Sequence, residues 1–212
     1  MSILSVQNLS FDKYLKYYLI GKIRENIHIF NYNFEFGKIY CINSNLGDGG
    51  WGISWAISGQ FKLTKGQIKL DNKILSFKEL QKLSWGVGLD GEAFSFFENK
   101  TTRNLINKGL TRNDNFTTVE QIAKNFMLTN ERLDNNFKFL SGERWRASIA
   151  IGFANKKKIY CFPWIKPEIL IMYKDLWFKN ILEYLKKENY LIIIPTINRD
   201  IIKDMFDEAI NL

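Results

Sequence analysis

The N-terminal part of the chain combines alternating and continuous apolar patterns. Segments 3–11 and 28–36 alternate apolar and polar positions and are rich in β-branched and aromatic residues, which predicts half-buried antiparallel strands. Residues 38–44 form a nearly continuous apolar run, as expected of a strand buried on both faces. A glycine cluster and a helix-like segment, 53–61, follow this run. A strand, a glycine loop and a helix in this order are typical of phosphate-binding loops.

The middle of the chain changes from short strands to polar helical sequence. Residues 66–75 contain a turn signal between two strand-like runs, 77–83 has the pattern of a short helix, and 85–90 is a further strand candidate. From 95 to 139 the sequence is polar, rich in asparagine and helical in period. This change predicts a helical subdomain inserted into the fold.

The C-terminal part alternates helices and buried strands. We predict a helix at 140–154 that begins at a Ser-Gly turn, buried strands at 158–162 and 190–196, a helix at 174–188, and a closing amphipathic helix at 200–212. Repeated strand–helix alternation predicts a mainly parallel sheet.

Together these elements predict an α/β fold with a P-loop-like parallel core, an N-terminal antiparallel portion and an inserted helical subdomain. We expect one domain, 1–212, with the helical subdomain at about 95–139. No run reaches the roughly 18–20 apolar residues that a membrane-spanning helix needs. The N-terminal segment also lacks the basic-then-apolar pattern of a secretion signal, so we expect a cytoplasmic protein.

Composition and charge narrow the function only slightly. The chain is 46% hydrophobic and 25% charged, as in ordinary globular proteins. Its net charge of +8 is compatible with nucleic acid or an anionic surface, but only 156–158 form a basic block, so nucleic-acid binding is not favoured. Cys41 and Cys161 each follow an apolar pair and lie far apart in the sequence, which suggests core residues rather than a metal site or a disulfide.

Residues 140–162, LSGERWRASIAIGFANKKKIYCF, carry a specific resemblance. They resemble the signature motif of the ATP-binding-cassette (ABC) transporter ATPases, in which LSGG precedes a Glu or Gln, a basic helix and a buried strand, if one glycine is deleted. The matching signature residues are Leu140, Ser141, Gly142 and Glu143. The other elements follow the family's order over essentially the whole chain.

The glycine loop departs from the family pattern GxxxxGK[ST], which resembles residues 44–51 here. In that pattern the lysine neutralises the β- and γ-phosphates and the hydroxyl holds Mg²⁺. Gly50 and Trp51 stand at these two places, and Asp48 adds a negative charge. We therefore expect ATP and Mg²⁺ to bind weakly at this loop, or only at a site shared with a partner. The candidate loop residues are Gly47, Asp48, Gly49, Gly50, Trp51 and Gly52.

The remaining catalytic positions that the resemblance implies are also changed. Pro163 and Trp164 stand where the family has a magnesium-positioning Asp and the Glu that polarises water. Neither can coordinate a cation or accept a proton. We therefore predict no catalytic residue and no metal ligand in this chain.

Two further positions of the family pattern are altered. The glutamine of the Q-loop corresponds to Asp90, or to Leu89 if the register slips, and the switch histidine corresponds to Ile197 or Asn198. His28, the chain's one histidine, lies in an early strand and is expected to be an ordinary, partly exposed residue.

The resemblance implies a degenerate subunit that works by assembly. Family members sandwich ATP between the loop of one subunit and the signature of the other, so a subunit with an altered loop can still complete its partner's site. Ser141 could offer a hydroxyl there, next to a helix N-terminus; a structural helix cap is the alternative.

The expected partners are transporter membrane subunits and a second ABC ATPase subunit, at the inner face of the cell membrane. One rival interpretation is a stand-alone regulatory or binding module on a P-loop fold. A nucleic-acid-associated cassette protein is another, suggested only by the net charge.

Overall fold

The computed structural model describes residues 2–17, 21–88, 100–112, 117–137 and 143–212. The chain forms two compact units. We call residues 1–86 and 158–212 the sheet unit, and residues 87–157 the helical unit.

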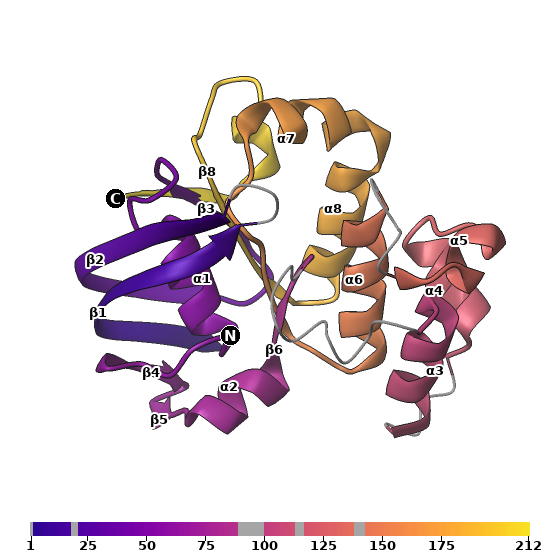
Figure 1. The fold of residues 1–212 in the computed structure, drawn as a ribbon, viewed down its shortest axis with the longest axis horizontal. Coiled ribbons are helices and arrows are strands. Elements are labelled where there is room, and N and C mark those ends of the chain that lie inside the picture. Colours follow the sequence, from indigo (N-terminus) through magenta and orange to yellow (C-terminus); the bar gives the residue numbers. More distant parts are fainter. Residues whose placement is uncertain (1, 18–20, 89–99, 113–116, 138–142) are drawn as a thin grey trace. The chain divides into compact units, whose positions relative to one another are not determined.

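The sheet unit contains an antiparallel and a parallel sheet (Figure 1). Among the described residues the antiparallel sheet has the order β2-β1-β4-β5 and the parallel sheet the order β6-β7-β8-β3-β9. The antiparallel strands are β1 (Ile3–Tyr17), β2 (Gly21–Glu35), β4 (Lys65–Leu70) and β5 (Lys73–Ile74). The parallel strands are β3 (Ile39–Asn43), β6 (Ser84–Gly86), β7 (Ile159–Cys161), β8 (Leu191–Thr196) and β9 (Glu208–Asn211).

Local sequence explains several of these strands. Asp71 and Asn72 join β4 to β5 with φ angles of 46° and 71°, the left-handed conformation that tight two-residue hairpins require. In the parallel sheet, β8 is buried along its whole length. Cys41 at the centre of β3 lies between Ile194 of β8 and Ala209 of β9, as its continuous apolar run predicts.

The helix α1 (Gly50–Ile57) packs on both sheets of this unit, against β1 and β2 and against β6, β7 and β8. The helix α2 (Phe77–Leu83) begins at a capping box formed by Ser76 and Glu79, which satisfies donors at the helix start. The helix α7 (Pro167–Tyr173) continues through a π-helical turn (Lys174–Phe178) into α8 (Lys179–Lys187). Side chains from β1, β2, β3, β8 and α1 form the main hydrophobic core.

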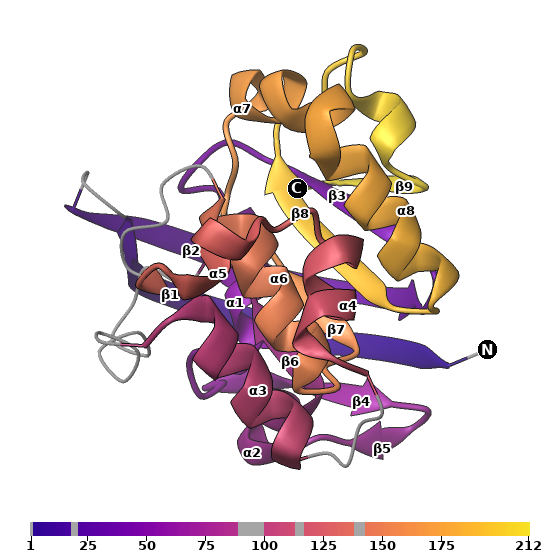
Figure 2. The same cartoon turned by 90° about the vertical axis from the view of Figure 1, so that its right-hand side faces the viewer.

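The helical unit consists of short helices in its described part (Figure 2). They are α3 (Thr102–Arg112), α4 (Val119–Asn125), α5 (Asn130–Asp134) and α6 (Arg144–Ala154). Here α3 and α4 both contact α6. Arg103 forms ion pairs with Glu120 at 2.8 Å and Asp134 at 2.7 Å, and thus links α3 to α4 and α5.

The C-terminus differs from the sequence prediction. The closing helix predicted at 200–212 is wrong, because Lys203–Met205 forms only a 3₁₀ turn and Glu208–Asn211 is the strand β9. Ile210 of β9 joins the main core, and β9 pairs with β3 in parallel. Pairing with β3 satisfies backbone groups that a helix would have satisfied internally.

The first two strands are longer than the predicted segments 3–11 and 28–36. Their pairing continues to Tyr17 and Gly21, beyond bulges near Leu9. This extension places residues 25–27 of β2 beside the glycines at the start of α1.

Candidate functional site

The glycine loop runs from the end of β3 to the start of α1, as the sequence predicts. Gly47 and Gly49 have φ angles of 101° and 96°, a conformation that glycine adopts without the penalty of a Cβ. Within the loop, the side chain of Asn45 donates a hydrogen bond to Asp48 at 2.8 Å. Asp48 itself is exposed.

A carboxylate of the chain itself, that of Glu25, contacts the backbone amides of this loop. Glu25 of β2 is fully buried and accepts hydrogen bonds from the backbone N–H groups of Gly47 at 2.7 Å and Gly52 at 3.1 Å. Burial raises the pKa of the Glu25 carboxyl above its ordinary value, while the amides of Gly52, Gly47, Gly49 and Trp51 oppose this by favouring the ionised form. The loop amides therefore already contact an acidic group.

Sequence reasoning missed Glu25, although a signal was present. Glu25 falls between Ile23 and Ile27 on the alternating, inward side of its strand. An acidic residue at an apolar position of a half-buried strand must find donors when it is buried, and here these donors are loop amides.

Close contacts limit which side chains positions 50 and 52 can carry. A Cβ built on Gly50 would lie 2.1 Å from the Oγ of Ser44, and one on Gly52 would lie 2.2 Å from the ring of Phe11. The Ser44 Oγ is buried and has no hydrogen-bond partner within the described part of the chain. The space beside both glycines is thus filled by neighbouring side chains.

Two positions at which the resemblance implies catalytic groups, and one of the two candidates for the switch histidine, come together in one apolar cluster. Trp51, Trp164 and Ile197 belong to it. The cluster also contains Leu15, Leu46, Trp55 and Phe61. The indole N–H of Trp164 donates to the backbone carbonyl of Ser44 at 2.9 Å, which fixes the ring against the loop. These residues supply hydrophobic packing and no group that accepts a proton or binds a cation at ordinary pH.

The other predicted positions are dispersed or fall outside the described residues. Asp90 and Leu89 lie outside them. The backbone N–H of Asn198 donates to the side chain of Asn43 at 2.8 Å. His28 is exposed on β2 and is not a member of the cluster.

Of the predicted signature residues, Leu140, Ser141 and Gly142 also lie outside the described part of the chain, and only Glu143 can be placed. Glu143 directly precedes α6. Its carboxylate pairs with Arg146 and, at 3.3 Å, with Arg132. These two cations compensate the negative charge at the start of the helix.

The structure offers little for metal or thiol chemistry. Within the described residues no three His, Cys, Asp or Glu side chains are grouped in a way that could hold a metal ion. Burial raises the pKa of the Cys41 thiol to about 12 and that of Cys161 further, so both thiols stay protonated and unreactive. No helix among these residues has the length and apolarity to cross a bilayer.

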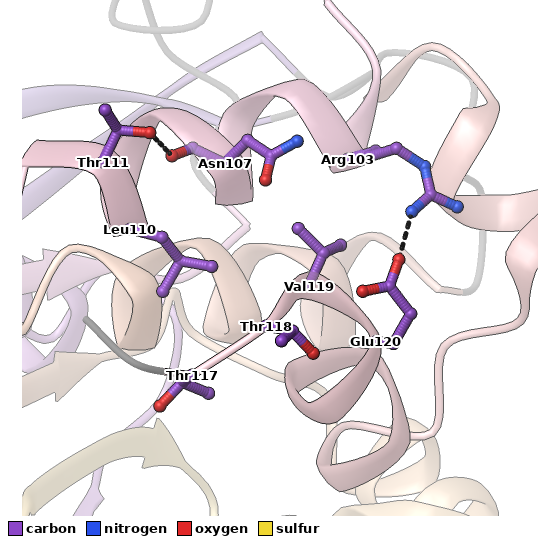
Figure 3. Close-up of a pocket in the computed structure, with 8 residues that line it drawn as sticks. All are labelled: Arg103, Asn107, Leu110, Thr111, Thr117, Thr118, Val119 and Glu120. Carbon is purple, nitrogen blue, oxygen red and sulfur yellow. Dashed lines mark hydrogen bonds and ion pairs between the residues drawn. The ribbon is translucent and has the colours of Figure 1, made fainter. Parts of the chain in front are cut away.

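A separate pocket of about 520 Å³ lies within the helical unit (Figure 3). It is lined by Arg103, Asn107, Leu110, Thr111, Thr117, Thr118, Val119 and Glu120. Arg103 pairs with Glu120 at 2.8 Å, and the Thr111 hydroxyl donates to the Asn107 carbonyl at 2.9 Å. Within this pocket, these polar groups therefore already have partners.

Comparison with known proteins points to one family. A family model described as ABC transporter matches residues 30–162. No curated protein matches the chain.

Several solved structures share the fold. A bacterial ABC transporter cassette, MJ0796, solved as a dimer, has a TM-score of 0.66 at 17% identity over 99% of this chain and 94% of its own. cbiO1 of Clostridium perfringens, part of the transporter complex cbiONQ, has a TM-score of 0.63 at 19% identity over 98% of this chain and 83% of its own. An ABC transporter ATP-binding protein of Pyrococcus furiosus has a TM-score of 0.68 at 15% identity over 99% of this chain and 97% of its own. At such low identity these likenesses show the fold alone.

Proposed function

Because the chain belongs to the ABC transporter family, we propose that it is a non-catalytic, ATPase-like subunit of a membrane transporter. It acts by assembly with membrane subunits and with a competent ATPase partner. In such an assembly the signature residues 140–143 meet the partner's nucleotide, whereas the candidate loop residues 47–52 bind nucleotide only weakly or at a site shared with the partner.

The observation that carries this proposal is the apolar cluster of Trp51, Trp164 and Ile197. In the family pattern the places of Trp51 and Trp164 supply a magnesium ligand and a group that polarises water, and Ile197 is one of the two candidates, with Asn198, for the place of the switch histidine. Phosphoryl transfer depends on positioned charges and metal ions. The indole rings of Trp51 and Trp164 and the aliphatic side chain of Ile197 cannot supply such charges or hold a metal ion. In this cluster these side chains pack together as hydrocarbon.

The relatives support assembly as the mode of action. MJ0796 forms a dimer and cbiO1 is part of a transporter complex. By analogy, the proposed subunit sits peripherally at the cytoplasmic face of a membrane, where its signature segment completes the ATP site of a partner.

The test has two parts. Calorimetric titration of the isolated protein with Mg-ATP is expected to show no micromolar binding, and a single-turnover assay no hydrolysis above background, because phosphate and metal ligands are replaced. A competent cassette assayed in parallel provides the positive control. Micromolar affinity or robust turnover by the isolated chain would refute the non-catalytic assignment.

The second part examines assembly. The affinity-tagged chain, expressed with its neighbouring genes, is expected to co-purify in detergent with a multi-span membrane subunit. A chain that elutes alone while the membrane subunit is present and folded would favour a stand-alone module instead.

A further inference from the structure

We propose that the glycine loop has a resident anion of its own, the Glu25 carboxylate, which occupies the backbone amides that would otherwise receive a phosphate group. This inference deepens the proposed function and rests on it in one respect, namely that the loop corresponds to the family's phosphate-binding loop.

The geometry is that of an anion held by backbone donors. Both carboxylate oxygens of Glu25 are engaged, Oε1 by the Gly47 N–H at 2.7 Å and Oε2 by the Gly52 N–H at 3.1 Å. Gly47 and Gly49 hold left-handed φ angles, which turn successive N–H groups toward one concave face. Such concavities at helix N-termini bind phosphates and carboxylates alike.

The helix start contributes to the same site. Gly52 lies in the first turn of α1, whose first N–H groups have no partner within the helix. A carboxylate at this end is favoured by the helix dipole. Glu25 is fully buried. The loop amides must therefore donate to its carboxylate, because an ionised carboxylate removed from water is tolerated only when donors surround it.

The hairpin that carries Glu25 also covers the loop. The ring of Phe11 in β1 lies against Gly52, and the backbone carbonyl of Asn26 in β2 would lie 2.8 Å from a Cβ at Gly49. Glu25 is therefore delivered by a packed element, and its carboxylate excludes a second anion from the same amides by space and by charge.

The decisive experiment removes the carboxylate and offers a free one in its place. Glu25→Ala is prepared with the matched control Glu35→Ala, which removes a carboxylate from the same strand that pairs with Lys38 at 2.8 Å. Thermal unfolding of the native protein and both variants is followed in sodium formate, with sodium chloride at equal ionic strength as the reference.

Formate is expected to raise the unfolding midpoint of Glu25→Ala by about 3–6 °C at ten times its dissociation constant, as linkage predicts for a ligand that binds only the folded state. The native protein and Glu35→Ala should not show this formate-specific rise. Equal responses of all three proteins would overturn the proposal, because no vacated carboxylate site would then exist.

A second variant keeps the test decisive if Glu25→Ala does not fold. Glu25→Gln preserves the shape but directs an amide NH₂ at backbone donors. Hydrogen exchange of at least one of the Gly47 and Gly52 amides, the one that faces the new NH₂, is expected to accelerate about tenfold, while amides in β3 keep their rates. Unchanged exchange at both glycines would overturn the role of Glu25.

The two proposals can fail separately. Turnover of Mg-ATP by the native chain would refute the non-catalytic assignment without affecting the formate result. A missing formate response would refute the resident anion and leave the proposed function standing.

Discussion

At the scale of single residues, the hydroxyl of Ser44 fills space that a side chain at position 50 would need. A Cβ at Gly50 would lie 2.1 Å from the Ser44 Oγ and 3.2 Å from a methyl of Ile42. Real non-bonded carbon and oxygen atoms do not approach to 2.1 Å, so a lysine here requires Ser44 to move or to be replaced. The side chains that positions 44 and 50 can carry are therefore sterically coupled.

This coupling predicts the outcome of restoring the loop. Gly50→Lys with Trp51→Ser is expected to destabilise the protein, because it removes a buried indole at a cost of about 3–5 kcal/mol and overpacks position 50 at a cost of about 1–3 kcal/mol. Adding Ser44→Gly should recover the second part, about 1–3 kcal/mol, in urea unfolding.

Ser44→Gly alone serves as the control and should be nearly neutral, because it removes a buried hydroxyl without a partner in the described region. If the triple variant were no more stable than the double, the contact between positions 44 and 50 would not limit the loop. Both variants should hydrolyse no ATP in a single-turnover assay, since Pro163 and Trp164 supply no base.

At the scale of elements, the β1–β2 hairpin and α1 depend on each other. Phe11 of β1 lies against Gly52, and its ring also packs edge-on against Phe61 with centroids 5.6 Å apart. The hairpin brings Glu25 to the amides at the same end of α1. The residue at position 52 must therefore be small for the β1–β2 hairpin to pack against α1.

We predict that Gly52→Ala destabilises the protein by about 1–2 kcal/mol. Alanine gains roughly 1 kcal/mol in helix propensity, but overpacking against a buried ring costs about 1–3 kcal/mol or more, and the clash at 2.2 Å places this site at the upper end. Chemical denaturation of Gly52→Ala, Phe11→Leu and the double variant measures the coupling.

The double variant should lose about 1 kcal/mol less than the sum of the two single variants, because the smaller side chain at position 11 makes room for the new methyl group. Strictly additive losses would show that the methyl group is accommodated elsewhere and that the hairpin does not press on position 52.

At the scale of the whole molecule, the parallel sheet joins distant parts of the chain. β3, which carries the glycine loop, is flanked by β8 and β9 from the C-terminal segment. Asp207, just before β9, forms two hydrogen bonds with Ile39. Its carboxylate accepts from the Ile39 N–H at 2.8 Å, and its backbone N–H donates to the Ile39 carbonyl at 2.9 Å. The loop is therefore supported by residues near the end of the chain.

Truncation after Phe206 tests this support. The lost burial of Ile210 and the lost bonds to β3 are expected to cost about 3–6 kcal/mol, a large part of the stability of a typical domain. The truncation also leaves β3 as an exposed edge, which favours aggregation. Thermal unfolding and size-exclusion chromatography measure both effects.

A chain truncated after Asn211 is the matched control. It removes Leu212, which is 44% exposed and donates one backbone hydrogen bond to Asn43 at 3.2 Å, so the expected loss is about 1 kcal/mol. Similar stability of both truncated chains would mean that β9 does not support the sheet.

The sequence by itself determined the α/β class, the family and the order of most elements. Continuous apolar runs identified β3, β7 and β8, because a strand that is covered on both faces carries apolar side chains at nearly every position. The resemblance carried by residues 140–162 is confirmed by the family match over 30–162. These features depend on composition and pattern within short segments, which a sequence displays directly.

Only the tertiary structure decided which segments far apart in the sequence pair, pack or form hydrogen bonds with one another. Residues 200–212 have a helical pattern, yet β3 offers an open edge and the segment forms β9 instead. Trp51, Trp164 and Ile197 meet in one cluster, and Glu25 reaches the loop amides across a hairpin. Periodicity describes which face of a segment is apolar, whereas the partner of that face is chosen by packing and hydrogen bonding between distant residues, which local pattern does not encode.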